Sequence, residues 1–133
     1  RLEENFLDND VQLVAENADV SGKKNIIIQE LGMYSGDTNL NSSQEIQRKF
    51  FEVFFTEMKE EERIKAAFNF QLVDWSPEVT EIFREMLEDE GMSQEFIDQF
   101  AESLETIGLI NYNDGKRKKA WDEFLSWLIE FDK

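Results

Sequence analysis

The sequence contains no cysteine and no histidine, and it has a single proline among its 133 residues. Without cysteine the chain can form no disulfide and perform no thiol chemistry, and the redox compartment stays open. Without histidine it lacks the most common general base and metal ligand. Any proton transfer must therefore be carried out by carboxylates, tyrosine or lysine.

Positive charge is also scarce, because 30 acidic residues face 14 basic residues and the formal net charge is −16. Nucleic acids and anionic membrane surfaces bind basic protein surfaces, so we expect neither as a partner. No apolar run reaches the roughly 18 residues that a membrane-spanning helix needs. Hydrophobic residues nevertheless make up 41% of the chain, including 12 Phe and 3 Trp, which predicts a folded domain with a substantial core.

Two apolar runs predict β-strands. The first, NIIIQEL at residues 25–31, is rich in β-branched residues and too short for an independent helix. The second covers residues 64–75 and alternates between two faces. One face carries large apolar side chains, namely Phe68, Phe70 and Leu72, and the other carries Ala67, Asn69 and Gln71.

Capping signals predict the helices. A short helix is expected at residues 10–18, and the S-x-x-E pattern at residues 42–45 fits a capping box that begins a second helix. The residues expected to face inward from this second helix are Ile46, Phe50, Val53, Phe54 and Met58. Ser76-Pro77 begins a helix that ends at Gly91, and Ser93 caps another that ends at Gly108. A turn at residues 113–115 precedes a last helix.

Strands that alternate with helices pair in parallel and are covered by helices, so the order of elements predicts an α/β fold. Two parallel strands alone leave two unpaired edges and make a small core. We therefore interpret residues 1–133 as part of a larger sheet whose open edges favour self-association. The chain begins with Arg1, which we interpret as a processed product or a piece of a longer chain.

In β/α proteins, catalytic and binding residues gather at the carboxyl ends of the strands. Glu30 ends the first strand. If it shares a face with Ile26 and Ile28, its side chain stands at the rim, over the interior of the fold rather than against the helices. Asn69, Gln71 and Trp75 share one parity in the second strand and would face the same interior. Each has a plain structural alternative: a solvated carboxylate for Glu30, core packing for Trp75, and mutual or water hydrogen bonds for the two amides.

The segments IIIQELG, FNFQLVDWSPE and LETIGLINYNDGKRKKAW together resemble the C-terminal third of retaining glycoside hydrolases with a (β/α)8 TIM barrel. The resemblance spans nearly the whole chain, through motifs of moderate specificity. The closing segment is similar to the GL…Y…DG…KPAW ending of bacterial members, although Lys119 stands where a proline is frequent.

The resemblance implies roles for individual residues. Glu30 occupies the position of the nucleophile at the end of the seventh strand, and Trp75 that of the tryptophan that floors a sugar subsite after the eighth. Asn69 and Gln71 would contact sugar hydroxyls, and Tyr34 in the loop after the first strand would reach over a subsite. The implied substrate is an oligo- or polysaccharide, and a secreted or cell-envelope location would suit such an enzyme.

The family's acid/base glutamate lies on the fourth strand, usually in an Asn-Glu pair, and no such segment is present here. A retaining mechanism needs two carboxyl groups about 5–5.5 Å apart, so we expect no activity from this chain alone. Asp37 and Asp74 are the nearest substitutes for the missing acid. No cofactor or metal is expected, because the DND at residues 8–10 lacks the glycine and distal glutamate of a calcium loop.

A second hypothesis belongs to another functional class. The charge of −16 and the many aromatic residues fit a non-catalytic, acidic, helix-rich domain that binds a basic protein partner. We also expect the basic run at residues 116–119 to pair with neighbouring acids rather than to bind a ligand.

Overall fold

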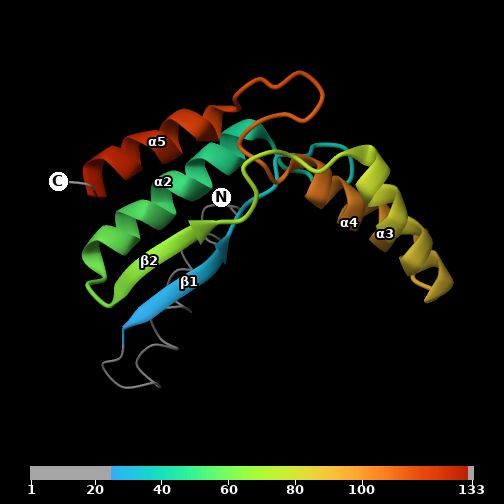
Figure 1. Ribbon diagram of the computed structural model, residues 1–133, viewed down its shortest axis with the longest axis horizontal. Coiled ribbons are helices and arrows are strands. Elements are labelled where there is room, and N and C mark those ends of the chain that lie inside the picture. Colours follow the sequence, from blue (N-terminus) through green and yellow to red (C-terminus); the bar gives the residue numbers. More distant parts are fainter. Residues whose placement is uncertain (1–24, 132–133) are drawn as a thin grey trace.

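The computed structural model describes residues 25–131, which combine a two-stranded parallel sheet with four α-helices (Figure 1). The elements in chain order are β1 (Ile26–Leu31), α2 (Gln44–Glu60), β2 (Ile64–Asn69), α3 (Pro77–Asp89), α4 (Gln94–Thr106) and α5 (Lys119–Phe131). The predicted α/β class and the parallel pairing are confirmed. The helix expected at residues 10–18 lies outside the described residues.

The register of the sheet contains an irregularity that matters for Glu30. Ile28 pairs with Ala67 and Leu31 pairs with Asn69, so β1 advances by three residues while β2 advances by two. Such a bulge interrupts the alternation of side chains along the strand. As a result both Ile28 and Leu31 pack against the helical core, although they are three residues apart.

Helices α2 and α5 pack against each other on one face of the sheet (Figure 1). The buried cluster between these elements consists of Leu31, Phe51, Phe54, Phe55, Leu109 and Ala120. Phe51 meets Phe124 of α5 edge-on at 5.8 Å, and Phe55 stacks on Trp127 at 5.9 Å between ring centroids. Aromatic side chains each bury a large apolar area, so this cluster supplies much of the stabilising free energy.

The inward face predicted for α2 is only partly right. Phe54 is buried as expected, but Phe51 and Phe55 are buried in place of Phe50 and Met58, which are only partly covered. The reason is the contact with α5, because Phe51 and Phe55 both meet its aromatic rings. The periodicity of α2 alone carries no information about that partner.

The face of β2 that carries Ala67 and Asn69 was predicted to point away from the helices, and the structure shows the reverse. Ala67 packs against the phenylalanine-rich cluster, where the large rings leave room only for a small side chain. Phe68 lies on the other face with 59% of its surface exposed, and Ile27 of β1 is exposed to 61%. Among residues 25–131 no helix covers this second face, which we call the open face of the sheet.

The second strand ends earlier than predicted. It stops at Asn69 rather than at Trp75, because Gln71 has a left-handed backbone with φ of 68° that an extended strand cannot continue through. Beyond this turn Val73 forms a single parallel bridge with Ile110. The chain then enters the α3–α4 hairpin, which extends away from the sheet (Figure 1).

The capping predictions hold for two helices and fail for one. Ser76 and Ser93 cap α3 and α4 through their hydroxyl oxygens, as expected. In α2 the cap is Ser43, whose Oγ accepts a hydrogen bond from the Ile46 amide at 3.1 Å, so the predicted S-x-x-E box does not form. Ser42 instead donates its hydroxyl to the Tyr34 carbonyl at 2.9 Å, which fastens the loop after β1.

Candidate functional site

Glu30 lies at the carboxyl end of β1 and is exposed. The expected shared face with Ile28 is wrong, because Ile28 packs against the helical core. The bulge brings Leu31 onto the helix-covered face as well, and Glu30 lies exposed between these two residues. Within residues 25–131 no hydrogen bond or ion pair engages its carboxylate.

One of the two amides predicted to contact a sugar lies on the opposite side of the sheet from the one expected. Asn69 pairs with Leu31 and lies on the helix-covered side, contrary to the prediction. Its Nδ2 donates to the backbone carbonyl of Gln71 at 2.7 Å, which stabilises the left-handed turn that ends β2. Tyr34 is partly buried in the loop after β1, where its carbonyl accepts the hydrogen bond from Ser42.

Trp75 sits at the entrance to α3 and is partly buried. Its backbone amide donates to the Leu104 carbonyl at 3.2 Å, and its indole contacts Phe83 with ring centroids 5.5 Å apart. The indole Nε1 is buried and has no hydrogen-bond partner within the described part of the chain. One side of the ring therefore packs on α3 while the residue also borders a cleft.

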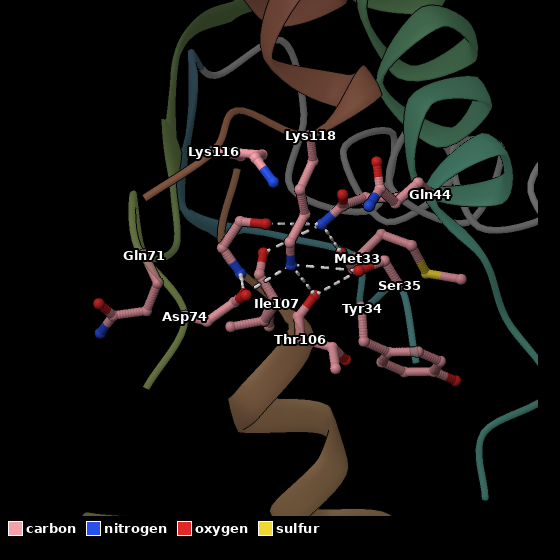
Figure 2. A network of polar contacts seen from close by, with 12 residues as sticks. Met33, Tyr34, Ser35, Gln44, Gln71, Asp74, Thr106, Ile107, Lys116 and Lys118 are labelled. Atoms are coloured by element: carbon pink, nitrogen blue, oxygen red, sulfur yellow. Dashed lines mark hydrogen bonds and ion pairs between the residues drawn. The ribbon is translucent and has the colours of Figure 1, made fainter. Parts of the chain in front are cut away.

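The most buried charges of the described chain form an ion pair beside that cleft (Figure 2). Lys118 Nζ donates to Asp74 Oδ1 at 2.6 Å, to the Thr106 carbonyl at 2.9 Å and to Ser35 Oγ at 3.1 Å. The side chains of Lys118 and Asp74 are only 2% and 6% exposed. All three ammonium protons thus have an acceptor, which a buried charge requires.

Burial dominates the electrostatics of this pair. It raises the pKa of Asp74, although the hydrogen bond from Lys118 and the Gly108 amide act in the opposite direction. It likewise lowers the pKa of Lys118, against the hydrogen bond and the charge of Asp74. Removal from water penalises both charged forms, so each residue depends on the other to remain ionised.

A glycine and a buried glutamine complete the support of the pair. The Gly108 amide donates to Asp74 Oδ1 at 2.8 Å, and a Cβ at Gly108 would lie 2.3 Å from the backbone nitrogen of Asp74. Gln47 of α2 is fully buried and donates from Nε2 to the carbonyls of Met33 at 2.7 Å and Gly108 at 3.0 Å. These contacts join the loops that follow β1 and α4.

The cleft beside the pair has a volume of about 720 Å³. Its walls come from the loop at residues 35–39, from the segment at residues 111–114, and from α4. Glu102 of α4 fixes the first wall, because its carboxylate accepts the amides of Thr38 at 2.9 Å and Asn39 at 2.6 Å. The cleft presents mainly carboxylates and amides, with Trp75 and Tyr112 as its aromatic residues.

The site predicted from the sequence is therefore divided in two. Trp75 borders the cleft, whereas Glu30 is not among the residues that line it. Asp37 and Asp74 both line the cleft, but Asp74 is already engaged by Lys118 and is unsuited to act as a free acid. The predicted pairing of the basic run with acids is confirmed for its three lysines, since Lys116 and Lys119 also pair with Asp114 and Glu45. Arg117 instead lies over the ring of Trp121, 4.8 Å from its centroid.

Within residues 25–131 no group of three or more acidic side chains is placed to hold a metal ion. None of the helices in this part of the chain has the length and apolar character needed to cross a membrane. Comparison of the chain with protein-family models, with curated proteins and with solved structures found no match.

Proposed function

We propose that this chain is the C-terminal segment of a (β/α)8 barrel of the retaining glycoside hydrolase type, in which Glu30 is the nucleophile. One observation carries the proposal: the sheet is parallel and covered by helices on one face, while Glu30 is exposed at the carboxyl end of β1. The inner face of a barrel is filled by side chains from its other strands. Exposed Ile27 and Phe68 have the character that such an inner layer needs.

In the proposed reaction the Glu30 carboxylate attacks the anomeric carbon of a sugar as the glycosidic C–O bond breaks. The leaving oxygen takes a proton from an acid on another strand of the barrel, and a glycosyl ester forms on Glu30. The residue that donated the proton to the leaving oxygen then deprotonates a water molecule. This water attacks the anomeric carbon, breaks the ester bond, and releases both the sugar and the Glu30 carboxylate. Gln71 and Tyr34 contribute hydrogen-bonding groups near the strand ends, and Trp75 offers a ring on which a sugar packs.

The test is covalent labelling of the complete barrel protein that contains this chain. Incubation with an activated fluoro-glycoside, followed by peptide mapping with mass spectrometry, should place the label on Glu30. Glu30→Gln should abolish labelling, whereas Glu62→Gln, at an exposed carboxylate before the start of β2, should leave it unchanged. A label on any other carboxylate would refute the assignment.

The 133-residue chain alone should not hydrolyse aryl β-glycosides. General acid catalysis contributes about 10²–10⁴-fold, and the other strands would also position the substrate. Glu30 does not share the cleft with Asp37 or Asp74, so neither of these acids is placed to replace the missing one. Turnover that disappears in Glu30→Gln would contradict this prediction and require a second acid within the chain.

A protein-interaction function is the second candidate, and a different observation favours it. Residues 77–106 contain ten carboxylates and one guanidinium beside several exposed apolar side chains. Capture of the chain by a basic partner, and release by moderate salt, would support this function. Glycan binding that is lost in Trp75→Ala would favour the first candidate instead.

A further inference from the structure

The α3–α4 hairpin has two chemically different sides. The side that borders the cleft is polar and holds the ion pair between Arg84 and Asp98, at 2.6 Å, and the hydrogen bond from Thr80 to Glu105. On the other side Phe83 of α3 and Phe100 of α4 meet with ring centroids 6.1 Å apart. Among residues 25–131 this second side has no counterpart of the polar bonds that fix the first.

The apolar side extends beyond the two rings into solvent. Val79, Ile82 and Met86 lie on the face of α3 that carries Phe83, because they follow helical spacing, and they are 41%, 60% and 55% exposed. On α4, Phe96 is 46% exposed and stacks on Phe100 at 6.1 Å. We call these six residues the α3–α4 apolar face. Contiguous exposed apolar surfaces mark interaction sites more often than isolated side chains do.

The hairpin that carries this face is strongly negative. Residues 77–106 carry ten carboxylates and one guanidinium, so this segment contributes −9 of the net charge of −16. The single guanidinium, on Arg84, is already paired with Asp98 on the polar side. By helical position Glu85 and Asp89 flank the apolar face on α3, and both are exposed.

We propose that the α3–α4 apolar face binds a cationic amphipathic helix of a partner protein. The apolar stripe of that helix packs on Ile82, Met86 and Phe96, and its lysines or arginines reach the flanking carboxylates. This is the helix-in-groove mode of recognition, and flexible methionine suits a surface that adapts to its ligand. A second copy of this chain is disfavoured as the occupant, because it would place −9 against −9, and an anionic membrane is repelled in the same way.

The inference rests on the protein-interaction candidate and makes no use of Glu30, so it is independent of the glycosidase proposal. Its experiment uses the purified full chain and a synthetic amphipathic helix of leucine and lysine as the probe. Isothermal titration calorimetry should show saturable binding that weakens by about tenfold or more between low and physiological salt. A peptide of the same composition with leucine and lysine scrambled, and a leucine–glutamate helix, should bind at least tenfold more weakly.

Paired variants locate the surface. Ile82→Gln with Met86→Gln should weaken binding by about tenfold or more, because central apolar contacts carry most of the affinity of an interface. The matched control is Leu128→Gln with Ile129→Gln on α5, at side chains exposed to 51% and 59%, which should leave binding unchanged. For charge, Glu85→Gln with Asp89→Asn should weaken binding, whereas Glu57→Gln with Glu60→Gln, at exposed positions on α2, should not. Circular dichroism checks that every variant is folded.

Three outcomes would overturn the inference, and they have different meanings. If the wild-type chain binds neither the amphipathic nor the scrambled cationic peptide, the protein-interaction function itself fails. If it binds but both pairs of variants behave alike, the partner site lies elsewhere on the chain. If sedimentation shows a wild-type dimer that Ile82→Gln with Met86→Gln dissociates, the occupant of this face is a second copy of the chain.

Discussion

Replacement of Lys118 by methionine should strongly lower the free energy of unfolding, because it leaves the buried Asp74 carboxylate without its partner. Methionine matches the length and apolar stem of lysine but removes the charge and all three hydrogen bonds that Nζ donates. Asp74 would then remain buried with only backbone donors such as the Gly108 amide. Removal of one partner of a buried pair costs about 3–5 kcal/mol, a large part of the roughly 5–15 kcal/mol that stabilises a domain.

The assay is urea unfolding of the chain, followed by tryptophan fluorescence and by circular dichroism. Lys119→Met is the matched control, because the neighbouring lysine is exposed to 61% and forms only a surface pair with Glu45. This control should cost less than about 1 kcal/mol. Asp74→Asn should cost about 1–3 kcal/mol, since Asn can still accept hydrogen bonds from Lys118 and Gly108.

The double variant Lys118→Met with Asp74→Asn isolates the interaction. It removes both charges, so it should be less destabilised than the sum of the two single variants by about 1–3 kcal/mol. Replacement of a whole buried pair by neutral groups is often tolerated, whereas an isolated buried charge is not. Strict additivity of the two changes would refute the view that each charge requires the other.

The pH dependence supplies a second check of the same reasoning. Burial raises the pKa of Asp74, and the loss of Lys118 removes an interaction that lowers it. A carboxylate with a raised native pKa binds a proton that the unfolded chain releases, so the native state gains stability as the pH falls toward the unfolded value. The deficit of Lys118→Met relative to wild type should therefore shrink between pH 7 and about pH 4.5. A deficit that is constant or grows over this range would show that the cost is not electrostatic.

Two further predictions concern the backbone that supports the site. Gly108→Ala should destabilise the chain by about 3 kcal/mol, because the new Cβ would lie 2.3 Å from the Asp74 nitrogen. Gly91→Ala should cost only about 1 kcal/mol, because Gly91 has a φ of 76° but open space around it. Thermal unfolding of both variants compares the two costs, and equal costs would contradict the argument. Ser43→Ala should cost about 1 kcal/mol through loss of the α2 cap. Ser42→Ala should lose the separate hydrogen bond to Tyr34 without fraying α2. Hydrogen exchange at the Ile46 amide should therefore increase in Ser43→Ala and not in Ser42→Ala.

Features encoded locally were predictable from the sequence. The β-branched run at residues 26–28 predicted β1, and Ser76 and Pro77 predicted the start of α3 because they act on the adjacent backbone. The α3–α4 pair and α5 followed from helical periodicity. The parallel pairing of β1 and β2 followed from the long connection between them.

Features that depend on tertiary contacts were not predictable in the same way. Gln47 is a polar residue on a helix, and only the carbonyls of Met33 and Gly108 explain its complete burial. Lys118 was expected only to pair with a neighbouring acid, like the rest of its basic run, yet it lies 44 positions from the aspartate that it pairs with. In both cases the partner is supplied by the fold and leaves no periodic signal in the sequence.

Glu30 shows where an argument from the alternation of a strand fails. Simple alternation from Ile28 would direct it to the same side as that residue, which packs against the helices. The bulge before Leu31 adds one residue to β1, and a shift of one residue sends a side chain to the opposite face. The face on which Glu30 lies therefore cannot be taken from the apolar pattern of the strand, because that pattern does not indicate the bulge.

The separation of Glu30 from the cleft also constrains the proposed glycosidase mechanism. Trp75 packs on Phe83 and borders the cleft, whereas Glu30 lies near the end of β1 and is not among the residues that line the cleft. A sugar held against Trp75 is thus not the sugar that Glu30 attacks, unless other strands bring the two surfaces together. The proposal therefore requires an extended glycan that spans several subsites. Labelling of Glu30 and glycan binding at Trp75 consequently measure two separable parts of the proposal, and loss of one need not abolish the other.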